Sequence, residues 1–174
     1  MNIQLSGLNI MELNRLRLLD LFCGVGGWSK GFIANGWECV GVDIKEFDYP
    51  GTFIKSDVYD LDPEFINSFD GIVCSPPYEE YARAWLPWLR GDGKPEQWAV
   101  DLLQWSVDLC SGHECRLTEC SVFSGKHVDD GSRFGSYMLW GDVPALVPYT
   151  VRKKTKTSGM KPEKRAEIPF DLAH

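Results

Sequence analysis

The sequence predicts an α/β fold with a doubly wound, mostly parallel sheet. Two observations carry this prediction: strand-like apolar runs alternate with short helical patterns, and the first run ends in a glycine-rich turn that opens a helix. The chain has 174 residues, 44% of them apolar, which suits a single globular domain. We therefore expect one domain over residues 1–150 and a basic tail over residues 151–174.

Local signals define the elements of the first half. Apolar runs predict four strands, over residues 15–22, 38–44, 52–58 and 71–75. A short helix over residues 28–35 closes at Gly36, and a second over residues 62–69 has Asp62 as its N-cap and Pro63 in its first turn. Ligands of such sheets bind at the carboxyl ends of the strands, so the residues that follow each strand are the candidate site.

The second half contains the longest helical pattern, over residues 94–110. Its large apolar side chains recur at helical spacing, and we expect them to form the core face: Trp98, Leu102, Trp105 and Leu109. A strand is predicted over residues 116–123, and residues 135–148 predict one more strand with a turn or short helix. Beyond Thr150 the chain is polar until a short helical pattern at its end.

Composition disfavours several classes of protein. No run approaches the roughly 18 apolar residues of a membrane span, and no secretory signal is visible, so we expect a cytoplasmic protein with no membrane partner. The six cysteines include no CxxC pair. A zinc site from Cys110, Cys115, Cys120 and His113 is conceivable, but we favour reduced, mostly buried thiols and no metal.

The charge of the chain is unevenly distributed. The net charge is −7, yet residues 152–165 carry seven basic residues and one acid, which leaves 11 basic and 24 acidic residues elsewhere. Such a basic segment on an acidic body is either a phosphate-contacting arm, with Lys153 and Lys154 as its candidate DNA contacts, or a solvated loop.

The glycine-rich turn indicates a nucleotide-like cofactor. Gly24, Gly26 and Gly27 let the backbone approach a ligand, and Asp43 follows Gly24 by 19 residues, about the spacing at which an acid reaches a ribose. Asp57, after the third strand, is placed to meet the edge of an adenine. The pattern is neither GxGxxG nor a triphosphate loop, which leaves an adenosine ligand without pyrophosphate, and S-adenosylmethionine (SAM) fits that description.

The fourth strand runs into Ser75, Pro76, Pro77 and Tyr78. Two prolines and an aromatic residue at the mouth of a sheet suggest a pocket for a flat ring. The aromatic-rich segment over residues 79–95 follows. We expect its tryptophans to pack on the core and Arg83 to contact a phosphate or the substrate. We expect His113 and His127 to lie on the surface.

Six stretches, in this order, resemble the DNA cytosine-5 methyltransferases: LLDLFCGVGGWSKGF, ECVGVDI, SDVYDL, CSPPYEEYARA, LTECS and KRAEIPFDLA. The first is specific and the later ones are individually weak. The resemblance implies a Rossmann-like methyltransferase domain that methylates a flipped cytosine in DNA, because a stacked base hides its reacting atom. Glu119 would hold the N3 edge of that cytosine. The implied SAM contacts are Asp20, Phe22, Gly24, Gly26, Gly27, Asp43, Ile44, Asp57 and Val58.

The chain departs from the family at the nucleophile. Cytosine-5 enzymes add a cysteine thiolate to the base, and that cysteine follows the prolines, where this chain has Tyr78. Three explanations compete. In the first, Tyr78 is a substitution that leaves little or no activity. In the second, Ser-Pro-Pro-Tyr works as in the amino-methyltransferases, where the aromatic residue stacks on the base and the serine accepts a hydrogen bond from the amine of the base, which gives N4-methylcytosine or N6-methyladenine. In the third, the chain only binds SAM or DNA.

The chain also lacks the target-recognition domain of that family. About thirty residues separate Arg133 from the terminal motif, too few for an independent domain. The family's Gln-x-Arg-x-Arg pattern is missing, and we expect Arg133 to replace part of it. Specificity would then come from the basic arm, from self-association or from a second subunit. A compact chain of this kind resembles a bacteriophage enzyme, which would act in the host cytoplasm.

Overall fold

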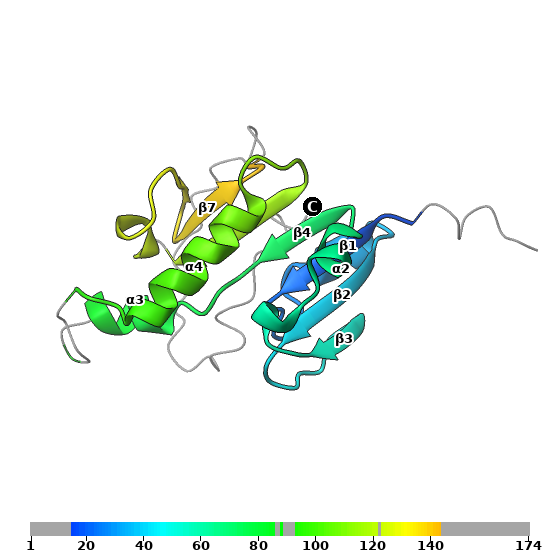
Figure 1. Cartoon of the computed structure of the whole chain (residues 1–174), viewed down its shortest axis with the longest axis horizontal. Coiled ribbons are helices and arrows are strands. Elements are labelled where there is room, and N and C mark those ends of the chain that lie inside the picture. The colour runs from blue at the N-terminus through cyan, green and yellow to red at the C-terminus, as the bar shows by residue number, and fades with distance from the viewer. Residues whose placement is uncertain (1–14, 86–87, 89–92, 122, 144–174) are drawn as a thin grey trace, which may run out of the picture.

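The structure is a computed structural model that describes residues 15–85, 88, 93–121 and 123–143. Its centre is a seven-stranded sheet in the order β3-β2-β1-β4-β5-β7-β6 (Figure 1). The strands are β1 (Arg17–Leu21), β2 (Glu38–Asp43), β3 (Thr52–Lys55), β4 (Gly71–Cys74), β5 (Arg116–Ser121), β6 (Ser132–Phe134) and β7 (Tyr137–Gly141). The strands β1 to β5 pair in parallel, and β7 runs antiparallel to β5 and β6. The predicted doubly wound, mostly parallel sheet is confirmed.

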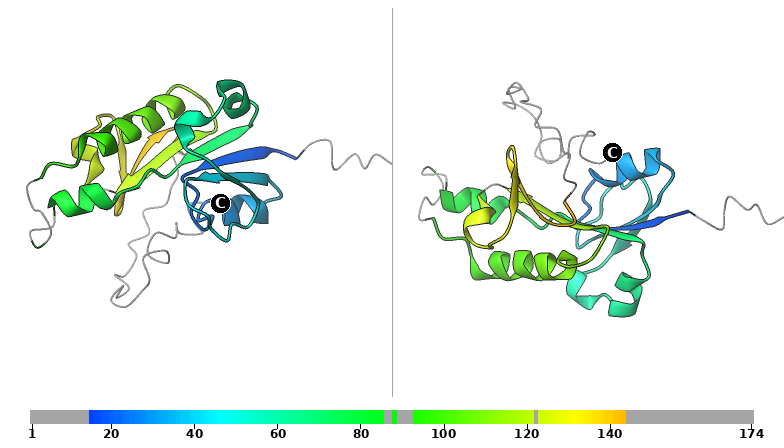
Figure 2. Two further views of the ribbon diagram at one scale, coloured as in Figure 1. Left: turned by 60° about the horizontal axis from the view of Figure 1, so that its bottom comes forward. Right: turned by 90° about the horizontal axis from the view of Figure 1, so that it is seen from above.

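Short helices cover both faces of the sheet. They are α1 (Ser29–Ala34), α2 (Pro63–Asn67), α3 (Glu79–Trp85) and α4 (Gln97–Cys110), with 3-10 turns η1 (Val58–Asp60) and η2 (Ser124–Lys126). Figure 2 shows α1 on one face and α2 and α4 on the other. The predicted cap of α2 is confirmed, because the Asp62 side chain accepts a hydrogen bond from the Glu64 backbone N–H and Pro63 lies in the first turn.

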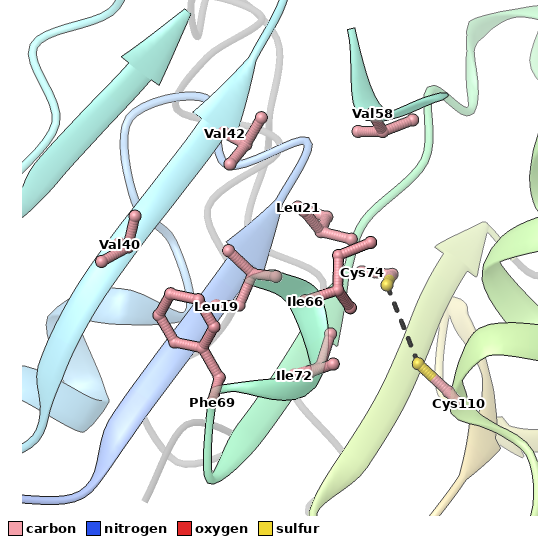
Figure 3. Close-up of a cluster of buried hydrophobic side chains, with 10 residues drawn as sticks. All are labelled: Leu19, Leu21, Val40, Val42, Val58, Ile66, Phe69, Ile72, Cys74 and Cys110. Carbon is pink, nitrogen blue, oxygen red and sulfur yellow. Dashed lines mark hydrogen bonds between the residues drawn. The ribbon is translucent and has the colours of Figure 1, made fainter. Parts of the chain in front are cut away.

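Alternate residues of each central strand bury opposite faces, as the pleat requires. Leu19 and Leu21 of β1 belong to a first core cluster on the α2 and α4 face (Figure 3). A second cluster, on the α1 face, contains Leu18, Trp28 and Val73. A third lies between α3, α4, β5 and β7 and consists of Tyr81, Ala99, Leu103, Val107, Cys120, Val128, Met138 and Trp140.

The predicted core face of α4 is confirmed in part, since three of its four residues pack against the first cluster, but the helix is centred on a neighbouring row of side chains. Trp98 is 53% exposed. The fully buried stripe is instead made of smaller side chains: Ala99, Leu103, Ser106, Val107 and Cys110. Leu102, Trp105 and Leu109 only flank the first cluster. Small side chains let the helix approach the sheet closely, and apolar spacing alone does not report residue size.

Other expectations fail locally. Trp88 is 76% exposed and does not pack on the core. His127 is half-buried, with its ring 5.6 Å from that of Tyr81, whereas His113 is exposed as predicted. The third strand ends at Lys55, because Asp57 caps the turn η1 instead of continuing the strand. The predicted basic tail, Lys153, Lys154 and the terminal motif lie outside the described residues.

Five of the six cysteines are buried as free thiols, as expected, and Cys115 is exposed. Within the described part of the chain, His, Cys, Asp and Glu side chains form no group of three that could hold a metal ion. No helix in those same residues is long and apolar enough to span a bilayer.

Candidate functional site

The strand order places the candidate site at the carboxyl edge between β1 and β4. The chain winds from β1 through β2 to β3 on one side and from β4 to β5 on the other. This reversal is the switch point at which open α/β sheets bind their ligands. The glycine loop leaves β1 there, and Ser75 leaves β4 beside it, with its backbone N–H donating to the Leu21 carbonyl at 3.1 Å.

The glycine loop is a sharp, tightly packed turn. Phe22, Gly24 and Gly26 all have positive φ, at 61°, 49° and 75°. A Cβ on Gly26 would lie 2.6 Å from the Cδ atom of Pro50, so the loop after β2 closes against the turn. Only glycine meets both requirements at that position, which explains its place in the motif.

Asp43 orders this loop from the end of β2. Its Oδ2 atom accepts the Gly24 N–H at 3.2 Å, and its Oδ1 atom accepts the Lys45 N–H at 3.0 Å. Each carboxylate oxygen keeps a second lone pair for another donor. Beside it, Ile44 is 61% exposed, an apolar side chain presented at the edge where the cofactor is predicted.

The two predicted contacts after β3 differ in their exposure. Asp57 is exposed, and its Oδ1 atom accepts the Tyr59 N–H at 3.0 Å. The side chain of Val58 is buried in the first cluster, which leaves only its backbone for a ligand. The adenine contact of Asp57 and the contact of Val58 stay predictions.

Asp20 lies inside the protein and not on the surface of the site. It is 1% exposed, and its Oδ2 atom accepts a hydrogen bond from the Ser29 hydroxyl at 2.6 Å. The Ser29 hydroxyl is also hydrogen-bonded to the Tyr49 hydroxyl. Burial raises the pKa of Asp20 to about 7, against the lowering effect of these hydroxyls. Asp20, Ser29 and Tyr49, the inner triad, therefore join β1, α1 and the loop after β2.

A second chain of hydrogen bonds crosses the switch point. The indole N–H of Trp28 donates to the Ser75 hydroxyl at 3.1 Å, and the Ser75 hydroxyl donates to Glu119 Oε2 at 3.4 Å. The register pairs Cys74 with Thr118, so Ser75 and Glu119 follow on neighbouring strands. Glu119 is 9% exposed, and burial raises its pKa to about 7, partly offset by the Ser75 hydrogen bond. We name Trp28, Ser75 and Glu119 the outer triad.

The Pro-Pro-Tyr segment leads from Ser75 into α3. Pro76 is buried, and its carbonyl accepts a weak hydrogen bond from the Cys120 thiol at 3.9 Å. Pro77 and Tyr78 are half-buried, and the Tyr78 carbonyl accepts the Ala82 N–H in the first turn of α3. The Tyr78 side chain packs partly against the third cluster. Its stacking on a base stays a prediction.

The described cysteines offer no activated thiolate beside Glu119. Cys120 is adjacent in sequence but packs in the third cluster, and burial raises its pKa to about 12. The pKa of Cys23 is raised strongly by burial and by Asp20, and burial raises that of Cys39 to about 11. Burial also raises the pKa of Cys74, whose sulfur lies 3.7 Å from that of Cys110, on the α4 face (Figure 3).

The predicted DNA contacts within the described residues lie on the surface. Arg83 has a side chain 58% exposed and forms an ion pair with Glu80 at 2.6 Å. Arg133 is exposed, and its Nε atom donates to the Gly135 carbonyl at 3.3 Å. Both side chains are reachable from solvent, and their contact with DNA stays a prediction.

Three residues of the two triads were not among the predicted site residues. From the sequence, Trp28 was an aromatic residue after the glycine loop that we expected to cover the adenine or methionine part of the cofactor, with core packing almost as favoured. Ser29 and Tyr49 gave no local signal, because their partner Asp20 lies nine and 29 residues away along the chain. Only the packing of α1 and the loop after β2 against β1 brings them together.

Comparisons with known proteins are limited to structure. No protein-family model and no curated protein matches the chain. Among solved structures, a putative DNA modification methyltransferase encoded within an E. coli prophage is 23% identical over 63% of this chain and 33% of its own, with a TM-score of 0.46. A DNMT2 mutant of Spodoptera frugiperda is 20% identical over 62% of this chain and 36% of its own, with a TM-score of 0.38. The Entamoeba histolytica methyltransferase EhMeth is 14% identical over 65% of this chain and 40% of its own, with a TM-score of 0.42. This chain thus spans 33–40% of the length of those three chains. At these TM-scores the likenesses add nothing to the inference of function.

Proposed function

We propose that this chain is a SAM-dependent DNA methyltransferase that acts on a flipped cytosine. The observation that carries the proposal is the hydrogen bond between Ser75 and Glu119, at the carboxyl ends of β4 and β5 and beside the glycine loop. It places a hydroxyl and a carboxyl group with a pKa of about 7 together at the switch point, next to a loop suited to a nucleotide-like cofactor.

The residues of the β1 to β3 edge suit an adenosyl cofactor. The glycine loop brings its backbone to the surface, Asp43 keeps lone pairs for ribose hydroxyls, and exposed Ile44 offers an apolar contact for a flat ring. Phe22, Gly24 and Gly27 would line the same edge. When bound, SAM supplies the electrophilic methyl group, and the chain's own residues orient the acceptor.

Glu119 and Ser75 provide complementary contacts for the edge of a cytosine. Ionised Glu119 accepts from the exocyclic amine, and protonated Glu119 donates to N3. A pKa near 7 keeps both forms populated at neutral pH, which suits a group that exchanges a proton during the reaction.

The candidates for the target atom differ in the acceptor chemistry that they require. Resemblance favours C5, but that route needs a thiolate, and the position that would supply it is Tyr78. The second candidate is therefore the amino nitrogen, N4 of cytosine or N6 of adenine. The observation that favours the amino nitrogen is the position of the Ser75 hydroxyl, which Trp28 holds in place. This hydroxyl keeps a lone pair that can accept an amine proton. The third is a SAM- or DNA-binding module without transfer.

DNA engagement relies on features at the periphery. Arg83 and Arg133, with Lys153 and Lys154 of the basic tail, are the proposed phosphate contacts. We propose that a second subunit or self-association contributes to sequence specificity.

Nucleoside mass spectrometry of DNA incubated with SAM tests the proposal. The unchanged chain should yield N4-methylcytosine if the amine is the target, whereas Tyr78→Cys should create or greatly raise 5-methylcytosine if C5 is. Glu119→Gln is the matched control and should lose either product. Absence of SAM binding by calorimetry would refute the proposal in all its forms, and SAM binding without any product would leave only the binding module.

A further inference from the structure

The outer triad has a directed order of donors and acceptors. The Trp28 indole carries an N–H and no acceptor, whereas an ionised carboxylate only accepts. The Ser75 hydroxyl lies between them, 3.1 Å from the indole nitrogen and 3.4 Å from Glu119 Oε2. A hydroxyl can donate once, so in this arrangement its proton points to Glu119 and one of its lone pairs is occupied by Trp28.

Each member of the triad is held by its own element. Trp28 is 3% exposed and packs in the second cluster, directly before α1. The Ser75 backbone continues the pairing of β4 with β1 through its hydrogen bond to the Leu21 carbonyl. Glu119 lies within β5, between its neighbours β4 and β7. The Ser75 hydroxyl at the centre of the triad can rotate, and its two partners favour one orientation.

We propose that Trp28 is a positioning residue that orients the Ser75 hydroxyl toward Glu119 and so sets the outer triad to receive an N–H donor from the substrate. With the indole in place, Ser75 offers the substrate a lone pair and no proton. A base that presents an amine, such as cytosine or adenine, fits this pattern, and a keto base such as uracil or thymine does not. The inference deepens the proposed function and rests on it for the identity of the substrate.

The same order of bonds favours the ionised form of Glu119. A hydroxyl that donates to a carboxylate stabilises the negative charge of the carboxylate. The hydrogen bond from Trp28 strengthens this stabilisation because it holds the Ser75 hydroxyl in one orientation. Cys120, next to Glu119 on β5, faces the third cluster, where burial raises the pKa of its thiol, and the charges of Glu119 and Glu79 add to this effect. Asp20 on β1 is occupied by Ser29. Ser75 is therefore the polar neighbour through which Trp28 can affect Glu119.

The test is a titration of the Glu119 carboxyl followed by carbon-13 NMR in the full chain without SAM or DNA. Trp28→Phe keeps an aromatic ring in the cluster and removes the N–H donor together with part of the indole ring. The pKa of Glu119 should rise by about 0.5 in Trp28→Phe and by about 1 in Ser75→Ala. Trp37→Phe is the matched control, since Trp37 packs against the same cluster and edge-on against Phe32. In this variant Glu119 should titrate as in the unchanged protein.

A second measurement needs no substitution at Trp28. The indole N–H resonance of Trp28 should shift with the midpoint of the Glu119 titration, this coupling should vanish in Ser75→Ala, and the Trp37 resonance should not follow it. A folded Trp28→Phe variant that titrates as the unchanged protein, or a Trp28 resonance indifferent to Glu119, would overturn the inference. Because neither readout needs a reaction, a coupled triad in a protein that transfers no methyl group would refute the proposed function alone.

Discussion

Two buried carboxylates on the same face of the sheet are each backed by a serine and an aromatic side chain, and they differ in how they are enclosed. In the inner triad Asp20 is 1% exposed, and its bond to Ser29 measures 2.6 Å. In the outer triad Glu119 is 9% exposed, and its bond to Ser75 measures 3.4 Å. The inner triad has the shorter hydrogen bond, is closed to solvent and lies beside the glycine loop. The outer group is looser and lies where the substrate is proposed.

The aromatic partner explains part of the difference. The Tyr49 hydroxyl can donate or accept, so the inner triad can rearrange its protons without leaving a group unsatisfied. The Trp28 indole only donates, so the outer triad has one direction. A network that can satisfy itself suits a structural role, and a directed one suits recognition of a particular ligand edge.

The largest expected effect is on the pH dependence of stability. Burial raises the pKa of Asp20 from 3.8 to about 7 and that of Glu119 from 4.5 to about 7. Each carboxyl holds its proton more tightly when folded, so its contribution is fully present below the unfolded pKa and is lost as the pH rises through about 7. At pH 8, Asp20→Asn should raise the free energy of unfolding by about 4 kcal/mol and Glu119→Gln by about 3 kcal/mol.

Urea unfolding at pH 4.5 and pH 8 measures this effect. At pH 4.5 both variants should fall within about 1 kcal/mol of the unchanged protein, because the folded carboxyls are then protonated. Glu38→Gln removes a charge at an exposed position of β2 and serves as the control, with no gain expected at either pH. An equal gain at both pH values would contradict the assigned burial of these charges.

The next largest effects are expected when each of the two serines is replaced by alanine, because the two triads are proposed to have different roles. Ser75→Ala should lower kcat about 100-fold if the proposed function holds, and change the Kd for SAM less than about twofold. Ser29→Ala should cost about 2 kcal/mol of stability, since it leaves Asp20 and Tyr49 without their shared partner, and keep kcat at saturating SAM within about threefold. Methylation kinetics and thermal unfolding of both variants would show the reverse pattern if the triads had been assigned to the wrong roles.

The smallest effect concerns the two aromatic partners. Tyr49→Phe removes a hydroxyl from the inner triad and should cost about 1 kcal/mol of stability, while the Ser29 bond to Asp20 remains. The Glu119 titration should be unchanged in Tyr49→Phe, whereas that of Asp20 should move to higher pH because it loses part of its hydrogen-bonded network. A shift of Glu119 in this variant would mean that the two triads are coupled and not separate.

Local chemistry made one part of the site predictable. Gly24, Gly26 and Asp43 follow strands whose apolar runs are visible in the sequence, and a tight turn with positive φ requires glycine wherever it occurs. The outer triad was only partly predictable. Ser75 was identified from the Ser-Pro-Pro-Tyr segment after the fourth strand and Glu119 from the family resemblance, whereas their contact depends on the pairing of β4 with β5. The buried stripe of α4 was missed because spacing does not report which of two adjacent rows has the smaller side chains.

The sequence by itself determined the alternation of strands and helices, the glycine loop, the cap of α2 and the candidate edge of the sheet. These depend on backbone preferences and on apolar periodicity, which act over a few residues. Only the tertiary structure decided that Trp28 reaches Ser75 across 47 positions and that Ser75 reaches Glu119 across 44. It also decided that Cys120, next to Glu119, packs in the third cluster. Such contacts depend on strand order and on the face to which each side chain points, and a one-residue change of register would move the side chains of a strand to the opposite face.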